Sequence, residues 1–353
     1  PATALSTHVP LTKPQLPGIA VPLAAAVAWG LSGLISLFLE WPVAGWVVLG
    51  WVFFVVGMPA WAQAVEGRRK ATDRLITTMV WTTFAVAMMP LVAVSWTVIE
   101  RGAPALTVEF LTSDQSGVIG VVGGILHAII GTAIITLVAT LISVPVGIMA
   151  AVYLVEYGKG NRLARVLTFL VDVMTGIPSI VAGLFALALF TLLLGPLPRI
   201  AIGGSIALSV LMIPIVVRST EEMLKLVPDE LREGAYALGV PKWRMITKVV
   251  LPTALGGIIT GATLAVARVA GETAPLLLIA GTLRGTNFNP FDGAMQTLPV
   301  LIFSEATRGG LAAYVPFQIE RAWGAALVLI IIVMLLNLLA RVVGSFFSPK
   351  TGR

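Results

Sequence analysis

Two charged residues stand inside a strongly apolar segment of the chain. Arg268 and Glu272 lie four residues apart in segment 252–280, a spacing that predicts one shared helix face. A charge at membrane depth costs at least about 2.5–3.5 kcal/mol, so it normally faces protein or a watery cavity. The guanidinium fork stays protonated and fits the oxygens of an oxyanion. We therefore expect Arg268 to contact an anion in a transmembrane pathway.

Glu272 has two chemical roles open to it at this spacing. It can pair with Arg268 when no anion is bound, which lowers the cost of a buried cation. It can also accept a hydrogen bond from a protonated oxyanion, a contact that a fully ionised oxyanion cannot offer. The structural alternative for both residues is an i,i+4 salt bridge that clamps two helices.

A second polar group accompanies an interrupted span. Pro178 lies between Gly176 and Gly183, and Thr175 and Ser179 lie beside the interruption. Interrupted helices expose backbone groups that line pathways, so Thr175 and Ser179 are candidate pathway residues. The glycines favour close helix packing equally well.

Three further polar residues favour structural roles. Asp172, near the end of its span, is expected at the surface or as a cap. His127 opens a span and is expected as an amphipathic boundary residue rather than a proton relay. Asn337 is expected to bond between helices.

Enzyme chemistry has little support. The chain has no cysteine and two histidines, which excludes thiolate metal sites and most His-based catalysis. The pair Gly158-Lys159 has Tyr153 where a phosphate loop needs glycine, and Gly160 where it needs Ser or Thr. We expect a non-catalytic chain without a cofactor or metal of its own.

The elements that must hold these residues are membrane spans. Hydrophobic residues make up 58% and charged residues 11% of the 353 residues, which excludes an ordinary soluble protein. Runs of about 20 apolar residues predict an all-α polytopic membrane protein. Eight spans are predicted, at 18–39, 43–65, 75–99, 127–155, 168–195, 201–217, 252–280 and 322–344.

Lys and Arg divide unequally between the two sides of these spans. One side receives 17, the other receives five, and Arg268 stays inside a span. Because cytoplasmic loops carry the excess of Lys and Arg, both termini and loop 218–250 are predicted to be cytoplasmic. The excess of Lys and Arg over Asp and Glu thus reflects membrane topology, and nucleic-acid binding is excluded.

The predicted organisation has four parts. Residues 1–17 form a tail that is predicted to be disordered. Residues 18–66 form a transmembrane hairpin that turns at Glu40-Trp41-Pro42, and residues 67–347 form a six-span core. Residues 348–353 form a C-terminal tail. Within the outer loop 281–321, the apolar piece 295–303 is too short to span, so it lies at the membrane surface or dips inward.

Loop 218–250 predicts two short helices that meet at a corner. Pro228 suits a first helical turn, and Leu231, Ala235 and Leu238 recur at helical spacing. Gly239 can take the left-handed conformation, and Pro241 allows a second helix to begin at once. A helix of this kind, with an apolar stripe, is suited to a groove in another protein.

The same loop resembles the "EAA" loop of bacterial ABC-importer permeases. Glu233, Ala235, Gly239, Leu251 and Pro252 fall in that spacing, while Gly234 stands where Ala is usual and Val249 where Ile is usual. In that family the loop is the coupling helix that seats in the ATPase subunit. The resemblance therefore assigns ATPase coupling to Glu233, Gly234, Ala235, Leu238 and Gly239.

Three further stretches are similar to the permeases of phosphate-specific ABC importers. They are 124–132, 176–185 and 268–276, and the similarity extends over about 75–347, with the hairpin outside it. The family implies an inorganic phosphate importer in the bacterial cytoplasmic membrane. It implies as partners a second, PstC-like permease, a PstB-like ATPase dimer that binds ATP and Mg²⁺, and a PstS-like extracytoplasmic phosphate-binding protein.

Other readings stay open at this point. A sulfate or molybdate ABC importer differs only in the substrate, and the phosphate-family stretches are what speak against it. A secondary transporter predicts internal repeats and coupling carboxylates in the spans, whereas the sequence shows no repeat and only Glu272. A membrane scaffold would need neither Arg268 nor the corner loop.

Overall fold

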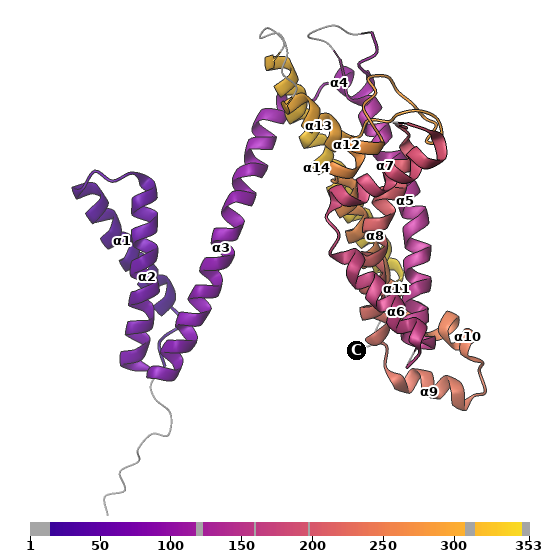
Figure 1. The fold of residues 1–353 in the computed structure, drawn as a ribbon. Coiled ribbons are helices and arrows are strands. Elements are labelled where there is room, and N and C mark those ends of the chain that lie inside the picture. Colours follow the sequence, from indigo (N-terminus) through magenta and orange to yellow (C-terminus); the bar gives the residue numbers. More distant parts are fainter. Residues whose placement is uncertain (1–14, 118–122, 159, 197, 308–314, 348–353) are drawn as a thin grey trace, which may run out of the picture. The chain divides into compact units, whose positions relative to one another are not determined.

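The structure is a computed structural model that describes residues 15–117, 123–158, 160–196, 198–307 and 315–347. The predicted tail 1–17 therefore lies mostly outside the described residues, and the tail 348–353 lies wholly outside them. The described chain is helical and forms two compact units, residues 1–95 and 96–353, which are described separately (Figure 1).

The first unit contains the predicted hairpin. Helices α1 (Ala20–Phe38) and α2 (Val43–Val65) pack on each other through Gly50, where a Cβ would lie 2.8 Å from the Trp29 ring. The indole N–H of Trp46 donates to the carbonyl of Trp29 at 2.9 Å. Pro42 caps α2 because its extended backbone precedes a helix without needing an N–H.

Helix α3 (Arg68–Gly102) begins directly after Gly67, whose φ of 94° suits glycine. At this turn the buried Glu66 pairs with Arg74 at 2.9 Å and accepts the amide N–H of Leu16 at 2.8 Å. The Arg74 hydrogen bond, followed by that of Leu16, lowers the pKa of Glu66 to about 2.

The second unit is built around helix α8 (Ala201–Lys225), which packs against α5 (Leu126–Val152) and α11 (Leu251–Ala270). Small residues allow the close approach: Gly147 of α5 lies on Val216, and Gly261 of α11 lies on Ser219. The buried Ser205 hydroxyl donates to the carbonyl of Ile135 at 3.2 Å, so α8 and α5 also share a polar contact.

Other elements complete this unit. After a 3₁₀ turn (Ala103–Ala105), the short helix α4 (Val108–Thr112) precedes α5, which continues into a π-helical turn, η2 (Tyr153–Tyr157). Helix α14 (Val315–Phe347) packs against α11 and α13 (Leu298–Thr307).

The predicted span 168–195 is two helices, α6 (Arg162–Thr175) and α7 (Ser179–Leu194), bent by 108°. The cause is Pro178, which lacks an N–H and disfavours the helical region for Ile177. Seven described helices are long and apolar enough to span a membrane, or eight with this pair as one span. The prediction of about eight spans is confirmed.

The apolar piece 295–303 is buried within the second unit. It forms α13, whose residues Leu298, Val300 and Leu301 are buried and which packs against α5 and α14. The amide of Leu298 donates to Thr132 Oγ1 of α5 at 2.8 Å. Helix α13 is therefore buried within the protein, which fits a length too short to span a bilayer.

Candidate functional site

Arg268 occupies the last turn of α11 and is exposed at the surface of this chain. Its neighbours Ala265, Val269 and Ala270 are buried in the core, so the backbone beneath it is firmly held. Among the described residues its side chain has neither a hydrogen-bond nor an ion-pair partner. The guanidinium N–H groups of this permanent cation are therefore available to a ligand or to a partner subunit.

Glu272 does not share a helix face with Arg268, and that prediction is wrong. Helix α11 ends at Ala270, and Glu272 lies in the turn before α12 (Ala274–Ile279), half-buried. Pro275 lacks an N–H for a continuing helix, so the chain breaks before it. Within the part of the chain described here, the two side chains form no salt bridge, which removes the simple clamp.

Thr175 and Ser179 flank the bend between α6 and α7. Thr175 is exposed, and its hydroxyl donates to the Val171 carbonyl at 2.9 Å, so its lone pairs stay available. Ser179 is the half-buried first residue of α7, directly after the capping Pro178. Both therefore border a helix terminus with unsatisfied backbone groups.

The fold brings the two interrupted segments together. Helices α7 and α12 pack on each other, and a Cβ on Gly183 would lie 2.5 Å from the Cα of Pro275. Gly183 thus serves close packing. Gly183 lies in α7, which follows the break at 176–178, and Pro275 lies in α12, which follows the break at 271–273; no spacing in the sequence indicates their contact.

Asp172 is exposed at the surface, as predicted, and also takes part in an ion pair. Its carboxylate pairs with Arg218 of α8, which also donates to Glu221 at 2.8 Å. This network joins α6 to the last turns of α8, which form the first part of loop 218–250.

The corner predicted for this loop is present. Helix α9 (Asp229–Ala237) follows the capping Pro228, and α10 (Lys242–Met245) follows Pro241. Between them Gly239 has a φ of 73°, the left-handed conformation that glycine adopts without strain. The turn closes by a hydrogen bond from the Gly239 amide to the Tyr236 carbonyl at 2.9 Å.

The predicted apolar stripe divides between two surfaces. Ala235 is buried and packs with Met245 and Val250 of its own chain, so it is absent from the exposed face. Leu231 and Leu238 remain exposed, Leu238 by 84%. The exposed face also includes Glu233, Gly234, Tyr236 and Trp243. Tyr236 and Trp243 were not predicted from the sequence.

Arg232 attaches α9 to the rest of the unit. Its guanidinium donates to Glu156 at 2.9 Å and to the carbonyls of Leu224 and Val227 at 2.9 and 2.6 Å. The partners come from η2 and from the end of α8, so sequence spacing gives no sign of the contact. The corner is thereby fixed to two spans.

Helices α10 and α11 form one continuous rod. With the π-helical turn η3 (Ile246–Val250) between them, Lys242–Ala270 is a single apolar span. At 1.5 Å per residue, the corner and Arg268 lie at opposite ends of a rod of roughly 40 Å. One continuous helical span therefore connects the corner to Arg268.

The outer loops are tied together by Asp114. Its carboxylate accepts the amide of Ser116 at 3.0 Å and both the amide and hydroxyl of Thr286 at 3.1 Å. These hydrogen bonds, with that of Ser116 the strongest, lower the pKa of the Asp114 carboxyl. Nearby, His127 lies in the first turn of α5, so it opens a span as predicted, but at 2% exposure it is buried inside the chain.

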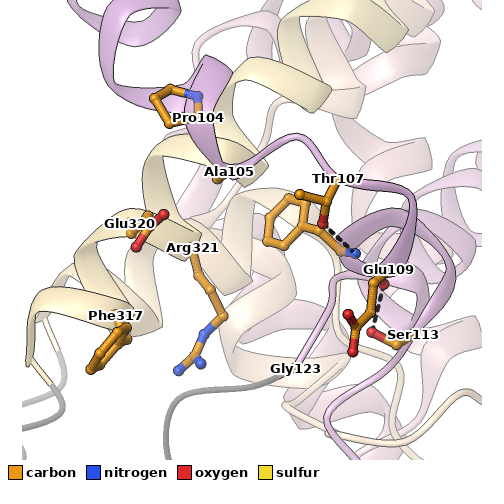
Figure 2. A pocket seen from close by; sticks show the side chains of 10 residues that line it. Pro104, Ala105, Thr107, Glu109, Ser113, Gly123, Phe317, Glu320 and Arg321 are labelled. Atoms are coloured by element: carbon orange, nitrogen blue, oxygen red, sulfur yellow. Dashed lines mark hydrogen bonds between the residues drawn. The ribbon is translucent and has the colours of Figure 1, made fainter.

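An outer pocket of about 220 Å³ lies beside the ion pair of Arg321 and Glu305, whose atoms are 2.9 Å apart. Figure 2 shows Arg321 of α14 and Phe317 on one side of it, with Thr107 and Glu109 on the other.

Nowhere in the described ranges do three His, Cys, Asp or Glu side chains gather as a metal site.

Comparison with known proteins agrees with this architecture. A family model described as "Binding-protein-dependent transport system inner membrane component" matches residues 143–353. The "Phosphate transport system permease protein PstA 1" of Mycobacterium tuberculosis (strain CDC 1551 / Oshkosh) is 47% identical over 78% of this chain and 90% of its own length. The PstA protein of Pasteurella multocida (strain Pm70) is 40% identical over 80% of this chain and 97% of its own.

A solved bacterial alginate ABC transporter shares the fold, with a TM-score of 0.58 and 14% identity over 80% of this chain and 97% of that chain. The chain belongs to the family of binding-protein-dependent transport system inner membrane components and, within it, to the PstA phosphate transport system permease proteins.

Proposed function

We propose that this chain is one of two permease subunits of an ATP-driven importer of inorganic phosphate. The observation that carries the proposal is the identity of 40–47% to PstA permeases over about four fifths of the chain. The exposed cation on α11 supports an anionic substrate, and the exposed corner on α9 and α10 supports coupling to an ATPase.

In this proposal Arg268 attracts phosphate into the pathway. Its guanidinium can present two parallel N–H groups to two phosphate oxygens, and it stays charged throughout. Thr175, Ser179 and Glu272 adjoin the two helix breaks, where backbone groups and side chains can take over the anion's hydration. Glu272 would accept a hydrogen bond from a protonated phosphate oxygen.

The coupling role belongs to the exposed face of α9 and the corner at Gly239. Glu233, Gly234 and Leu238 would contact the ATPase, while Ala235 holds the helix to its own chain. ATP and Mg²⁺ would bind in that PstB-like partner. Movement there would reach the pathway through Arg232–Glu156 and through the rod Lys242–Ala270.

The remaining assignments complete an import system. A PstC-like permease would provide the other half of the pathway, and a PstS-like binding protein would deliver phosphate from outside the cell. The excess of Lys and Arg on one side of the spans supports a cytoplasmic position for both termini and loop 218–250 in a bacterial cell.

Reconstitution tests the proposal. The chain is purified with its co-purifying subunits, placed in proteoliposomes and supplied with the binding protein. We expect phosphate uptake that requires ATP and is not competed by sulfate or molybdate. Competition by either oxyanion would assign a different substrate. Uptake by the chain alone, driven by an ion gradient, would mean a secondary transporter.

A further inference from the structure

The first unit contains a cleft between α2 and α3. At one end the helices are joined by the Glu66–Arg74 ion pair, and farther along Trp51 Nε1 donates to Thr82 Oγ1 at 2.9 Å. A cavity of about 680 Å³ lies alongside these connections. Volumes of 300–1,000 Å³ are typical of ligand sites.

The two ends of this cleft differ in chemistry. Its long walls are apolar and aromatic, formed by Trp51, Phe54 and Met58 of α2 and by Trp81 of α3. The end next to the α2–α3 turn is charged. Lys70, Asp73 and Arg74 line the cleft there. A ligand that fills the cleft must therefore be amphipathic.

Charge at that end favours an anion. Residues 66–74 carry four basic side chains and two acidic ones: Arg68, Arg69, Lys70 and Arg74 against Glu66 and Asp73. The buried Glu66 carboxylate, 1% exposed, lies 2.9 Å from Arg74 and 4.0 Å from Lys70, so one acid faces both of these cations, and Lys70 is still 47% exposed. Basic pockets between spans are suited to phosphate-bearing lipid head groups.

The length of the cleft matches one leaflet. Beyond the charged end, the lining of α3 continues from Arg74 to Ala85, which is 11 residue steps or roughly 16 Å along the helix. The hydrocarbon core of a bilayer is about 30 Å thick, so the cleft is as deep as one acyl chain layer. Binding of a peptide would not account for a cleft of this depth.

The connections across the cleft favour flexible chains over a helix. A helix is about 10 Å wide, and one inserted between α2 and α3 would break the Trp51–Thr82 hydrogen bond. A second space of about 420 Å³ borders other faces of the same helices, including Val52, Val55 and Met79, and Trp51 lines both spaces. Two acyl chains can pass on either side of this connection.

We propose that the cleft binds one anionic phospholipid. Its phosphodiester lies against Lys70 and Arg74, and its acyl chains lie along Trp51, Phe54 and Trp81. The lipid fills the space between α2 and α3 and thereby holds the hairpin to α3. This role is independent of the transported substrate.

A photoreactive phosphatidylglycerol with a diazirine on one acyl chain tests the site. The full chain, with its co-purifying subunits, is placed in phosphatidylcholine nanodiscs with a trace of the probe, and labelled peptides are mapped by mass spectrometry. We expect labelling concentrated in residues 51–58 and 77–85. Excess phosphatidylglycerol should compete, and excess phosphatidylcholine should not.

Two variants should each reduce this labelling by about fivefold. This is the effect expected from the loss of roughly one lipid-facing charge, and we expect a steric block of the cleft to have an equal effect. Lys70→Gln removes the charge, and Thr77→Trp fills the cleft without a charge change. Arg165→Gln, at an exposed cation of α6, is the matched control and should leave labelling unchanged.

Three results would overturn the proposal. Labelling that is uniform over all lipid-facing helices would mean annular lipid only. Equal competition by phosphatidylcholine would remove the charge requirement. A cysteine at position 77 that cross-links to a partner subunit would show that a protein helix occupies the cleft.

Discussion

Arg232 and Glu156 are 76 residues apart in the chain, yet their side chains form an ion pair at 2.9 Å. Both are largely buried, with side-chain exposures of 13% and 6%. The pair connects the corner of loop 218–250 to the end of α5, so the surface proposed for ATPase docking rests on a spanning helix.

Breaking this pair should detach the corner. Glu156→Gln leaves the guanidinium of Arg232 without its buried counter-charge, a loss of roughly 3 kcal/mol for a buried pair. We expect a lower thermal unfolding midpoint and less ATPase retained during purification. Asp229→Asn removes the other, 77% exposed partner of Arg232 and should change stability by less than about 1 kcal/mol. Equal effects of the two variants would contradict the anchoring role.

A matched pair of glycines tests the corner geometry. Gly239→Ala and Gly234→Ala each add one methyl group, and neither new Cβ would have an atom within 4 Å. Only Gly239 is left-handed, where alanine costs about 1–2 kcal/mol. We expect weakened ATPase association and uptake for Gly239→Ala, whereas Gly234→Ala should match or exceed the parent. Co-purification and coupled ATP hydrolysis measure this, and a fully coupled Gly239→Ala complex would disprove the requirement.

Arg268 is tested by keeping its size and removing its charge. Because its side chain is exposed, Arg268→Gln should fold and assemble normally but lose phosphate uptake. Arg268→Lys keeps the charge without the bidentate fork and should be partly active. Glu272→Gln should retain part of the uptake, since Glu272 is not the main anion contact. Parental uptake by a stable Arg268→Gln complex would remove Arg268 from the pathway.

Membrane orientation can be read by cysteine labelling, since the chain has no cysteine of its own. Phe288, in the outer loop, is 70% exposed, and Gly234 is exposed on α9. A cysteine at 288 should react with an impermeant maleimide on intact cells, and one at 234 only after permeabilisation. The opposite pattern would reverse the topology.

The turn at Glu66 predicts a pH-dependent contribution to stability. The folded pKa of about 2 lies below the ordinary value of 4.5, so the ionised form favours the folded state. Its contribution is fully present above pH 4.5 and is lost as the pH falls toward 2. Glu66→Gln should therefore be less stable than the parent at pH 7, and the difference should shrink below pH 4.5. A difference in unfolding midpoint that stays constant over this range would exclude the linkage.

Much of the fold follows from local features of the sequence. Apolar runs of about 20 residues define spans because a bilayer excludes unsatisfied backbone groups. Gly239 and Pro241 define the corner because their backbone freedoms and restrictions act within a few residues. The family resemblance is equally local, carried by short stretches such as 268–276.

Contacts between residues that are far apart in the chain were decided only by the tertiary structure. Periodicity placed Leu231, Ala235 and Leu238 on one stripe, but packing against Met245 buries Ala235 and leaves Leu238 exposed. The contact of Gly183 with Pro275 joins α7 and α12, although the two residues are some 90 residues apart in the chain. The Arg232–Glu156 pair likewise depends on where α5 and α8 end in space. The sequence by itself determines which segments span, turn and carry charge, whereas three-dimensional packing selects which of their side chains meet.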